Sequence, residues 1–596
     1  MYSFRKLREN TKLAIWDYID SVHRVLRTLT ILVSVLTMGI ILYFYGFPQT
    51  QETAYFCNIF IHCSLLFYMF KYLLSAFFNV HSFQYIRQHW LEGLVILFVL
   101  LWFVISLITG HNTFTYFMDT QSGWNFNDWT MMLVQLYFFI IMLVEISYIE
   151  DFLGKIRIGP GGLLIFSFLI LITIGTILLS LPEMTTHGIS FIDALFTSTS
   201  SSCITGLSTL NIGTDFTFKG QLVILLLIQL GGINVVCFAS FLSHFYKSGT
   251  LRQQSIMKEM FNTTLQNSRN LNREIILYTI IIEVIGFAFF FLYLNITENY
   301  SPQWAENAFL SAFHAIASFN NAGFSFLDGG MTNPVFRHDY YMQTITMVLI
   351  FLGGIGFLTM HDVLSTAKGR KQFWRRLQIT SKVVLKLSFV FIFLAAGAFF
   401  ILEYNNTNAG FSMTDRIYTS LFTAISNRTA GFNIIDTETF RMPTRLIIIA
   451  LMLVGAAPGS TGGGIKLTTF YILFKSAMAT IMGKKQVAIH NRSVSYEVVD
   501  RAYVVLLFTI LIVFFGSFIL SISDSQFSLE HIIFEVASAF GTAGLSLGIT
   551  PYLSTFGKFI IIIIMYIGRI TVLTFALSIA RRAFSRYSLA QTNFGI

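Results

Sequence analysis

The sequence predicts an all-α integral membrane protein in which four tandem span–pore helix–span repeats surround a central pore, preceded by four extra transmembrane helices. Three observations support this. Of the 596 residues, 55% are hydrophobic and only 12% are charged, whereas soluble domains carry roughly a quarter charged residues. Twelve apolar runs have the length of membrane spans. Four glycine-centred segments then recur at a regular interval.

A membrane span needs about 20 mostly apolar residues, and this sets the span assignment. The runs that meet the requirement are 27–46, 55–78, 90–108, 129–149, 163–181, 221–242, 274–294, 341–360, 383–402, 446–482 with an interruption, 502–520 and 559–579.

The basic residues indicate the orientation. Lys and Arg concentrate in alternate loops, while 47–54 and 110–128 contain neither. Because positive loops stay in the cytoplasm, both termini are placed there, in a multi-pass protein of the plasma or inner membrane. The same spread of charge over short loops argues against nucleic-acid binding. The four cysteines show no ligand-like spacing, which argues against disulfides and a zinc site.

Four repeats follow the first four spans. Each contains a serine that suits a helix start, at Ser190, Ser301, Ser412 and Ser528, and then a small-residue segment with a central glycine. The pattern recurs about every 110 residues. The predicted boundaries are 1–158 for the N-terminal four-helix extension, 159–255, 256–368, 369–492 with an intramembrane gating loop, and 493–596.

The glycine segments suit cation dehydration. A potassium ion loses its water only where backbone carbonyls replace it, and a carbonyl-lined strand needs φ values open chiefly to glycine. The predicted selectivity filter, with K⁺ as the substrate ion and no other metal, consists of Thr205, Gly206, Ala322, Gly323, Ala430, Gly431, Ala543 and Gly544. We predict neither catalytic residues nor a covalent cofactor.

Several motifs resemble the TrkH/KtrB/HKT superfamily of potassium transporters between about residues 161 and 583. They are 203–208 (CITGLS), 229–232 (QLGG), 320–324 (NNAGF), 427–432 (NRTAGF), 458–466 (PGSTGGGIK), 541–545 (GTAGL) and 567–569 (IGR). The resemblance implies potassium uptake by a homodimer with one pore per subunit. It also implies a cytosolic nucleotide-binding regulatory ring of the TrkA or KtrA type. Glycine at all four filter positions favours potassium over sodium. Asn234 departs from the small residue that relatives usually carry.

The third repeat's second span is interrupted at mid-membrane. Proline and repeated glycines cannot maintain a helix there, and a loop with few bulky side chains can swing aside at low cost. The resemblance places the gate in this loop. The predicted gate residues are Gly455, Pro458, Gly459, Ser460, Gly462, Gly463, Gly464, Lys466 and Arg569. Arg569 is expected to donate to loop carbonyls and to act as an electrostatic barrier; the alternative is a buried cation that only braces packing.

Other ionisable residues within spans have less specific interpretations. Glu283 either attracts cations or forms a structural ion pair. Lys71 pairs with Glu145 or another acid. The fourth span, 129–149, has no ladder of Lys or Arg, so a voltage sensor is not expected. The N-terminal extension is expected to serve docking or to stabilise a dimer.

Other functions remain as alternatives. A major-facilitator-like transporter of a small solute would need two six-span halves, which the four-fold pattern disfavours. A potassium-binding pump subunit would need a partner ATPase. An enzyme is not expected, because no nucleophile, paired acid or metal cluster stands out. The sequence does not separate a gated channel from a sodium- or proton-coupled potassium symporter.

Overall fold

Helices make up most of the part of the chain that the structure describes. The computed structural model describes residues 26, 29, 30, 32–78, 93, 160–233, 265–297, 302–327, 329–367, 372–484, 486–490 and 492–570. Within these residues the only sheet is a pair of two-residue antiparallel strands, β1 (Ala488–Ile489) and β2 (Arg492–Ser493).

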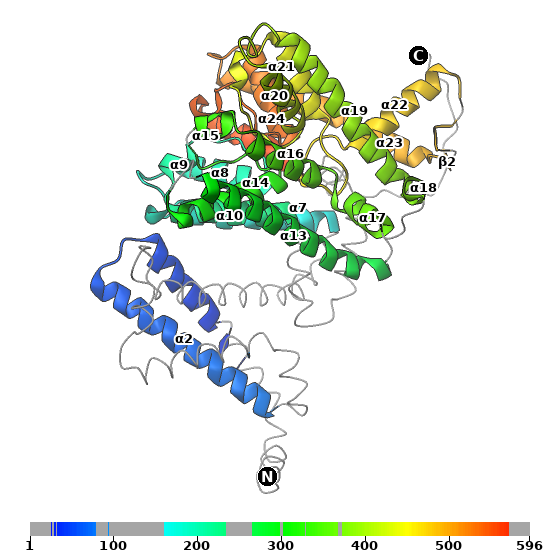
Figure 1. The fold of residues 1–596 in the computed structure, drawn as a ribbon. Coiled ribbons are helices and arrows are strands. Elements are labelled where there is room, and N and C mark those ends of the chain that lie inside the picture. The colour runs from blue at the N-terminus through cyan, green and yellow to red at the C-terminus, as the bar shows by residue number, and fades with distance from the viewer. Residues whose placement is uncertain are drawn as a thin grey trace.

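One pattern of helices occurs four times after residue 160, and we call its copies units 1 to 4 (Figure 1). The first helices are α7 (Pro160–Leu179), α13 (Leu265–Thr297), α19 (Ile379–Leu402) and α23 (Tyr496–Ser523). The short helices are α8 (Phe191–Cys203), α14 (Trp304–Phe319), α20 (Met413–Ser426) and α24 (Leu529–Gly541). The second helices are α10 (Phe218–Ile233), α16 (Tyr340–Gly354) with α17 (Phe357–Ala367), α21 (Met442–Leu453) with α22 (Leu467–Ile481), and α25 (Thr555–Ile570).

Small elements fill the connections. They are α9 (Ile212–Asp215), α15 (Pro334–Arg337), α18 (Phe373–Arg376) and the 3₁₀ turns η1 (Pro182–Met184), η2 (Gly330–Thr332), η3 (Thr437–Thr439) and η4 (Thr550–Tyr552).

Serine caps begin three of the short helices, as the sequence predicts. The hydroxyls of Ser190, Ser412 and Ser528 each accept a hydrogen bond from the backbone N–H three residues later. In unit 2 the predicted start is wrong by two residues, because Gln303 occupies the N-cap of α14; Ser301 itself lies outside the described residues. The later start puts Glu306 in the first turn, where a carboxylate suits the positive end of the helix dipole.

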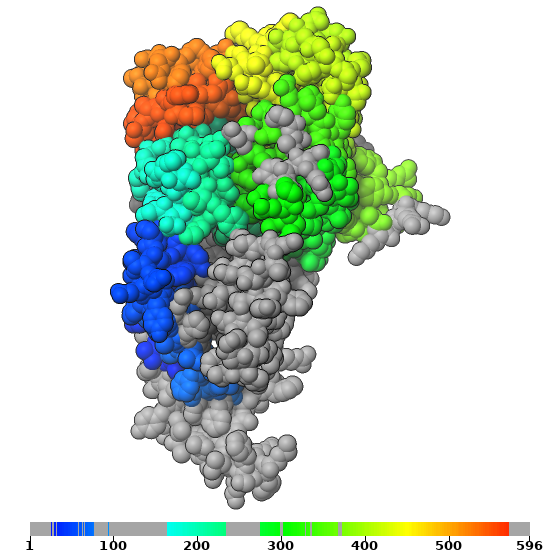
Figure 2. All heavy atoms as spheres, turned by 60° about the vertical axis from the view of Figure 1, so that its left-hand side comes forward, coloured from blue at the N-terminus to red at the C-terminus, as the bar shows by residue number. Residues whose placement is uncertain are grey.

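The units close into a ring. Each second helix packs on the next unit's short helix: α10 on α14, α16 on α20, and α21 on α24. Helix α25 of unit 4 packs on α8 of unit 1 and completes the circle. Figure 2 shows the result as four quarters of one face, cyan, green, yellow and orange in chain order. Every interface between neighbouring units therefore includes a second helix packed on a short helix.

Polar contacts at matching positions join three of these interfaces. The hydroxyl of Tyr340 donates to Asp415 at 2.5 Å, Arg445 pairs with Glu530 at 3.0 Å, and Lys558 pairs with Asp193 at 2.8 Å. In each case the acid lies in the first turn of a short helix. The hydrogen bond from Tyr340, and next that from Ser412, hold the pKa of Asp415 below its ordinary value.

Helix lengths agree with a membrane protein. Among the described residues, four helices are long and apolar enough to cross a membrane, or five if the bent pair α16–α17 counts as one span. The predicted span 341–360 is not one straight helix, because the chain bends by 99° between Gly354 and Phe357. Gly356, with φ of +83°, allows this break.

In the N-terminal extension the structure describes two apolar helices, Leu32–Gly46 and α2 (Gln51–Phe78). Thr37 donates to Ser64 at 2.8 Å between them, and Lys219 of unit 1 donates to the carbonyl of Tyr45 at 3.4 Å. The predicted spans 90–108 and 129–149 lie outside the described residues apart from residue 93, as does Glu145, the predicted partner of Lys71.

Candidate functional site

The four glycine segments meet at the centre of the ring. Gly206, Gly323, Gly431 and Gly544 have φ of +91°, +68°, +72° and +79°, in the region that only glycine enters without strain. The backbones also approach closely. A Cβ added to Gly206 would lie 2.6 Å from the carbonyl oxygen of Ala322 and 3.3 Å from the Cα of Gly544. A side chain at Gly206 would thus collide with the segment of unit 2.

The same approach repeats around the circle. Each glycine faces the carbonyl oxygen before the next unit's glycine, in the pairs Gly206–Ala322, Gly323–Ala430, Gly431–Ala543 and Gly544–Thr205. The structure therefore brings all eight predicted filter residues together.

Among the described residues, hydrogen bonding leaves the carbonyl oxygens of the eight predicted filter residues without a donor. The N–H groups of Thr205, Ala322 and Ala543 donate back to the preceding short helix, at 2.8 to 2.9 Å, and Ala430 does the same to Ser426 at 2.9 Å. Among the described residues, no hydrogen bond reaches a carbonyl oxygen of the four glycines or of the residues that precede them. A ring of carbonyl oxygens with open lone pairs can replace the water of a cation.

On the side where the chain leaves the glycines lies a cavity of about 240 Å³. Its lining includes Gly206, Gly323, Ser208, Asn211 and Ser325, and none of the described residues that line it is charged. A hydrated ion can reach the ring from this cavity without meeting a fixed positive charge.

The predicted gate loop lies against the opposite ends of the glycine segments. Its base is closed by a parallel bridge between Val454 and Ile465, with Gly455 N–H donating to Ile465 at 2.9 Å. Above the base, Gly463 N–H donates to the hydroxyl of Thr542 at 2.9 Å, and a Cβ on Gly462 would lie 2.8 Å from Thr429. The loop therefore contacts the residues directly before the glycine segments of units 3 and 4.

The break between α16 and α17 holds the loop from unit 2. Ala457 N–H donates to the carbonyl of Gly354 at 3.1 Å, and Phe357 N–H donates to the carbonyl of Gly459 at 3.0 Å. The carbonyl of Pro458 lies 2.6 Å from where a Cβ on Gly356 would stand. Ser460 bonds within the loop, to Ala457 at 2.6 Å.

Two cations among the predicted gate residues contact loop carbonyls. Arg569 donates to the carbonyl of Thr461 and, at 2.5 Å, to that of Gly231 in unit 1. Lys466 donates to the carbonyl of Gly462 at 2.6 Å. Arg569 thus has the carbonyl contacts expected from the sequence, and it links the loop to the fourth unit and the first.

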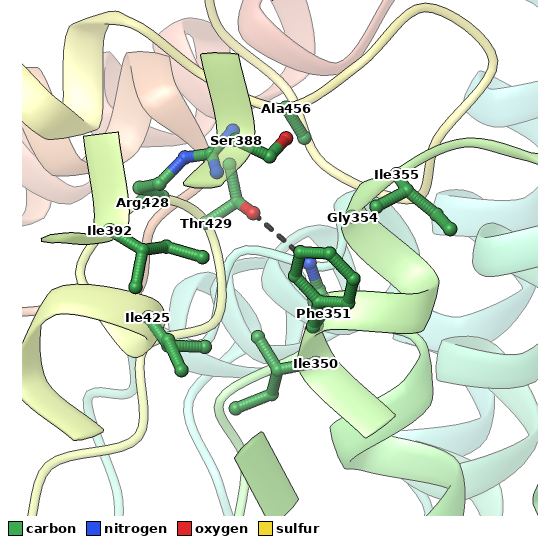
Figure 3. A pocket seen from close by; sticks show the side chains of 11 residues that line it. Ile350, Phe351, Gly354, Ile355, Ser388, Ile392, Ile425, Arg428, Thr429 and Ala456 are labelled. Carbon is green, nitrogen blue, oxygen red and sulfur yellow. Dashed lines mark hydrogen bonds between the residues drawn. The ribbon is translucent and has the colours of Figure 1, made fainter. Parts of the chain in front are cut away.

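Arg428, which the sequence analysis did not single out, is a third cation at this site. It is 8% exposed and donates to the carbonyl of Gly455 at 3.5 Å. It lines a small cavity of about 20 Å³ between units 2 and 3, together with Ser388 and Ala456 (Figure 3). At the same cavity the side chains of Asn321 and Thr429 are hydrogen bonded at 3.0 Å, which joins the segments of units 2 and 3. The NRTAGF motif contains Arg428, but nothing in the sequence places it beside the loop.

Comparison with known proteins identifies the family. A family model described as "TrkH: Cation transport protein" matches residues 162–586. The chain is 39% identical to the Ktr system potassium uptake protein B of Bacillus subtilis over 72% of its own length and 94% of the relative's. The chain belongs to the TrkH cation transport family.

Other similarities agree with membership of the TrkH family. The Ktr system potassium uptake protein B of Vibrio alginolyticus is 33% identical over 73% of this chain and 95% of its own. The solved structure of the potassium transporter TrkH from Vibrio parahaemolyticus has a TM-score of 0.56 at 16% identity, covering 70% of this chain and 84% of that one. The latter shows a shared fold. Because TrkH-family proteins are transporters, the prediction that this chain is not an enzyme is confirmed.

Proposed function

We propose that this protein takes up potassium ions across the cell membrane through the four-glycine ring, which acts as its selectivity filter. The observation that carries the proposal is the closed circle of glycines, each against the carbonyl oxygen of the next unit. The names of the two relatives describe potassium uptake proteins, which supports potassium as the ion.

Loop 454–466 serves as the gate in this proposal. It is held at the filter by Thr542, by the α16–α17 break and by Arg569. A passing ion would meet Arg569 and Lys466 at close range while the loop is in place, so their charge opposes permeation until the loop moves.

The assembly around the pore is also part of the proposal. It is a homodimer with both termini in the cytoplasm, regulated by a cytosolic nucleotide-binding ring of the TrkA or KtrA type. The names of both relatives describe a component of a Ktr system, which suits a membrane subunit with a partner. Light scattering of the purified protein tests the dimer.

Rubidium uptake into proteoliposomes tests the transport proposal. Purified protein is reconstituted, and uptake is followed under a membrane potential alone and with an inward sodium or proton gradient. Uptake driven by the potential alone supports a channel, whereas uptake that requires a sodium or proton gradient supports a coupled symporter. No uptake above that of empty liposomes under any condition would refute the proposed function.

A further inference from the structure

A buried carboxylate joins units 1 and 2 beside the second glycine segment. Glu283 of α13 is 7% exposed. Its Oε2 accepts from Nε2 of Gln229 in α10, and its Oε1 accepts from Nδ2 of Asn320, both at 2.9 Å. No Lys, Arg or His pairs with Glu283 among the described residues, so the structural ion pair considered from the sequence is replaced by two amide donors.

The orientation of the Asn320 amide is fixed. Its Nδ2 also donates to the carbonyl of Ile316 at 2.9 Å and to Oε1 of Gln229 at 3.1 Å. Its Oδ1 faces Gly232 so closely that a Cβ there would collide with it. Nδ2 has two hydrogens for these three acceptors, so one N–H is shared between two of them. Gln229 and Glu283 both present an oxygen to Asn320, and Glu283 also accepts from Gln229.

Asn320 leads directly into the filter. It ends α14, and Asn321, Ala322 and Gly323 follow it. The next side chain, Asn321, is bonded to Thr429 of unit 3. The glycine segment of unit 2 is thus held by units 1 and 2 through Asn320 and by unit 3 through Asn321.

One of these three residues, Gln229, lies near the contact of Arg569 with unit 1. Gln229 precedes Gly231 by two residues, and the carbonyl of Gly231 accepts from Arg569. A shift of α10 would therefore move both the support of Asn320 and the carbonyl that receives Arg569.

We infer that Glu283 is a positioning residue for ion selectivity. By accepting hydrogen bonds from both Gln229 and Asn320, it fixes the position of the glycine segment of unit 2. This inference rests on the proposed function. A carboxylate suits the role because it accepts at both oxygens, whereas an amide accepts at only one. A glutamine at this position would turn an N–H toward the N–H of Gln229, and the resulting repulsion would be relieved by moving α10 or Asn320.

The test compares a broken and a rebuilt network. Glu283→Gln should lower the rubidium-over-sodium uptake ratio about tenfold, which corresponds to about 1.4 kcal/mol. Glu283→Gln combined with Gln229→Glu keeps the atoms, the volume and the charge of the pair, and reverses only one hydrogen bond. The double variant should recover the ratio to within about twofold of the unmodified protein.

Glu403→Gln is the matched control. Glu403 is a buried carboxylate that accepts from Arg441 N–H at 3.0 Å and from the Thr444 hydroxyl at 2.5 Å, at the far end of α19. Its substitution should lower thermal stability and leave the rubidium-over-sodium uptake ratio unchanged. This is the result expected of a carboxylate that stabilises the fold without positioning the filter.

Each result decides the inference. An unchanged ratio in Glu283→Gln, or a double variant as impaired as the single one, overturns it. If Glu283→Gln does not fold, Asn320→Ala takes its place, with the same fall expected and an unchanged ratio overturning the inference. If the unmodified protein takes up no rubidium, the proposed function fails instead, so the two failures are distinguishable.

Discussion

Replacing Gly206 by serine tests the filter most directly. Gly206 has φ of +91°, and a Cβ there would lie 2.6 Å from the carbonyl oxygen of Ala322 and 3.2 Å from the Cα of Gly323. A side chain in this backbone region costs about 1–3 kcal/mol. The colliding atoms belong to the backbone of unit 2. They cannot move aside as the end of a flexible side chain could.

The cost is relieved most readily by displacing the carbonyl ring. A change of about 1.4 kcal/mol in the difference between two ions alters their ratio tenfold. If half of the strain appears as poorer potassium coordination, the rubidium-over-sodium uptake ratio falls about two- to twelvefold. Competitive uptake into proteoliposomes measures this ratio.

Gly188→Ser is the matched control for backbone strain. Gly188 also has positive φ, +79°, but nothing lies within 4 Å of its added Cβ, and it precedes α8 on the surface. It should lose stability by a similar amount and keep the uptake ratio. Gly206→Ser with an unchanged ratio, or an equal fall in both variants, would refute the filter assignment.

Three further predictions concern the loop and the helix starts. Deleting residues 459–464 should raise rubidium flux, measured as the initial rate in proteoliposomes; a silent pore would contradict the gate. Thr542→Val removes the acceptor of Gly463 N–H. Because such a bond contributes roughly 0.5–1.5 kcal/mol, rubidium leak through the closed gate should rise about two- to tenfold. Thr550→Val, which lies outside the loop contacts, is the control and should leave the leak unchanged. Ser528→Ala removes the N-cap of α24 and should lower unfolding free energy by about 1 kcal/mol without changing ion preference.

The recurring parts of the fold were predictable from sequence. A capping serine and a glycine that needs positive φ are local requirements, so they leave a mark at each copy. The serine and the glycine recur at the same spacing in all four units. This is why Gly206 and Gly544 could be matched across more than half the chain. The start of α14 was missed because Ser301 resembles the other caps and the sequence does not reveal that Gln303 occupies the position.

The contacts of the loop were not predictable in the same way. Gly463 meets Thr542, 79 residues away, and Arg569 meets Thr461 across 108 residues. The break after Gly354 lies inside an apolar run that reads as one span. Glu283 suggested an ion pair because charges stand out in an apolar sequence, whereas the donors of Gln229 and Asn320 are neutral.

The loop contacts also set the energy that a regulator of the proposed gate must supply. Two backbone bonds to the α16–α17 break and one to Thr542 contribute about 1 kcal/mol each, and the bond from charged Arg569 about 2 kcal/mol. Their sum is about 5 kcal/mol, and reversing a 99:1 equilibrium needs about 5.5 kcal/mol. A partner that binds the open state about 10⁴-fold more tightly than the closed one can therefore open the gate. It needs no direct contact with the filter, because the α16–α17 break and Arg569 already connect the loop to other units.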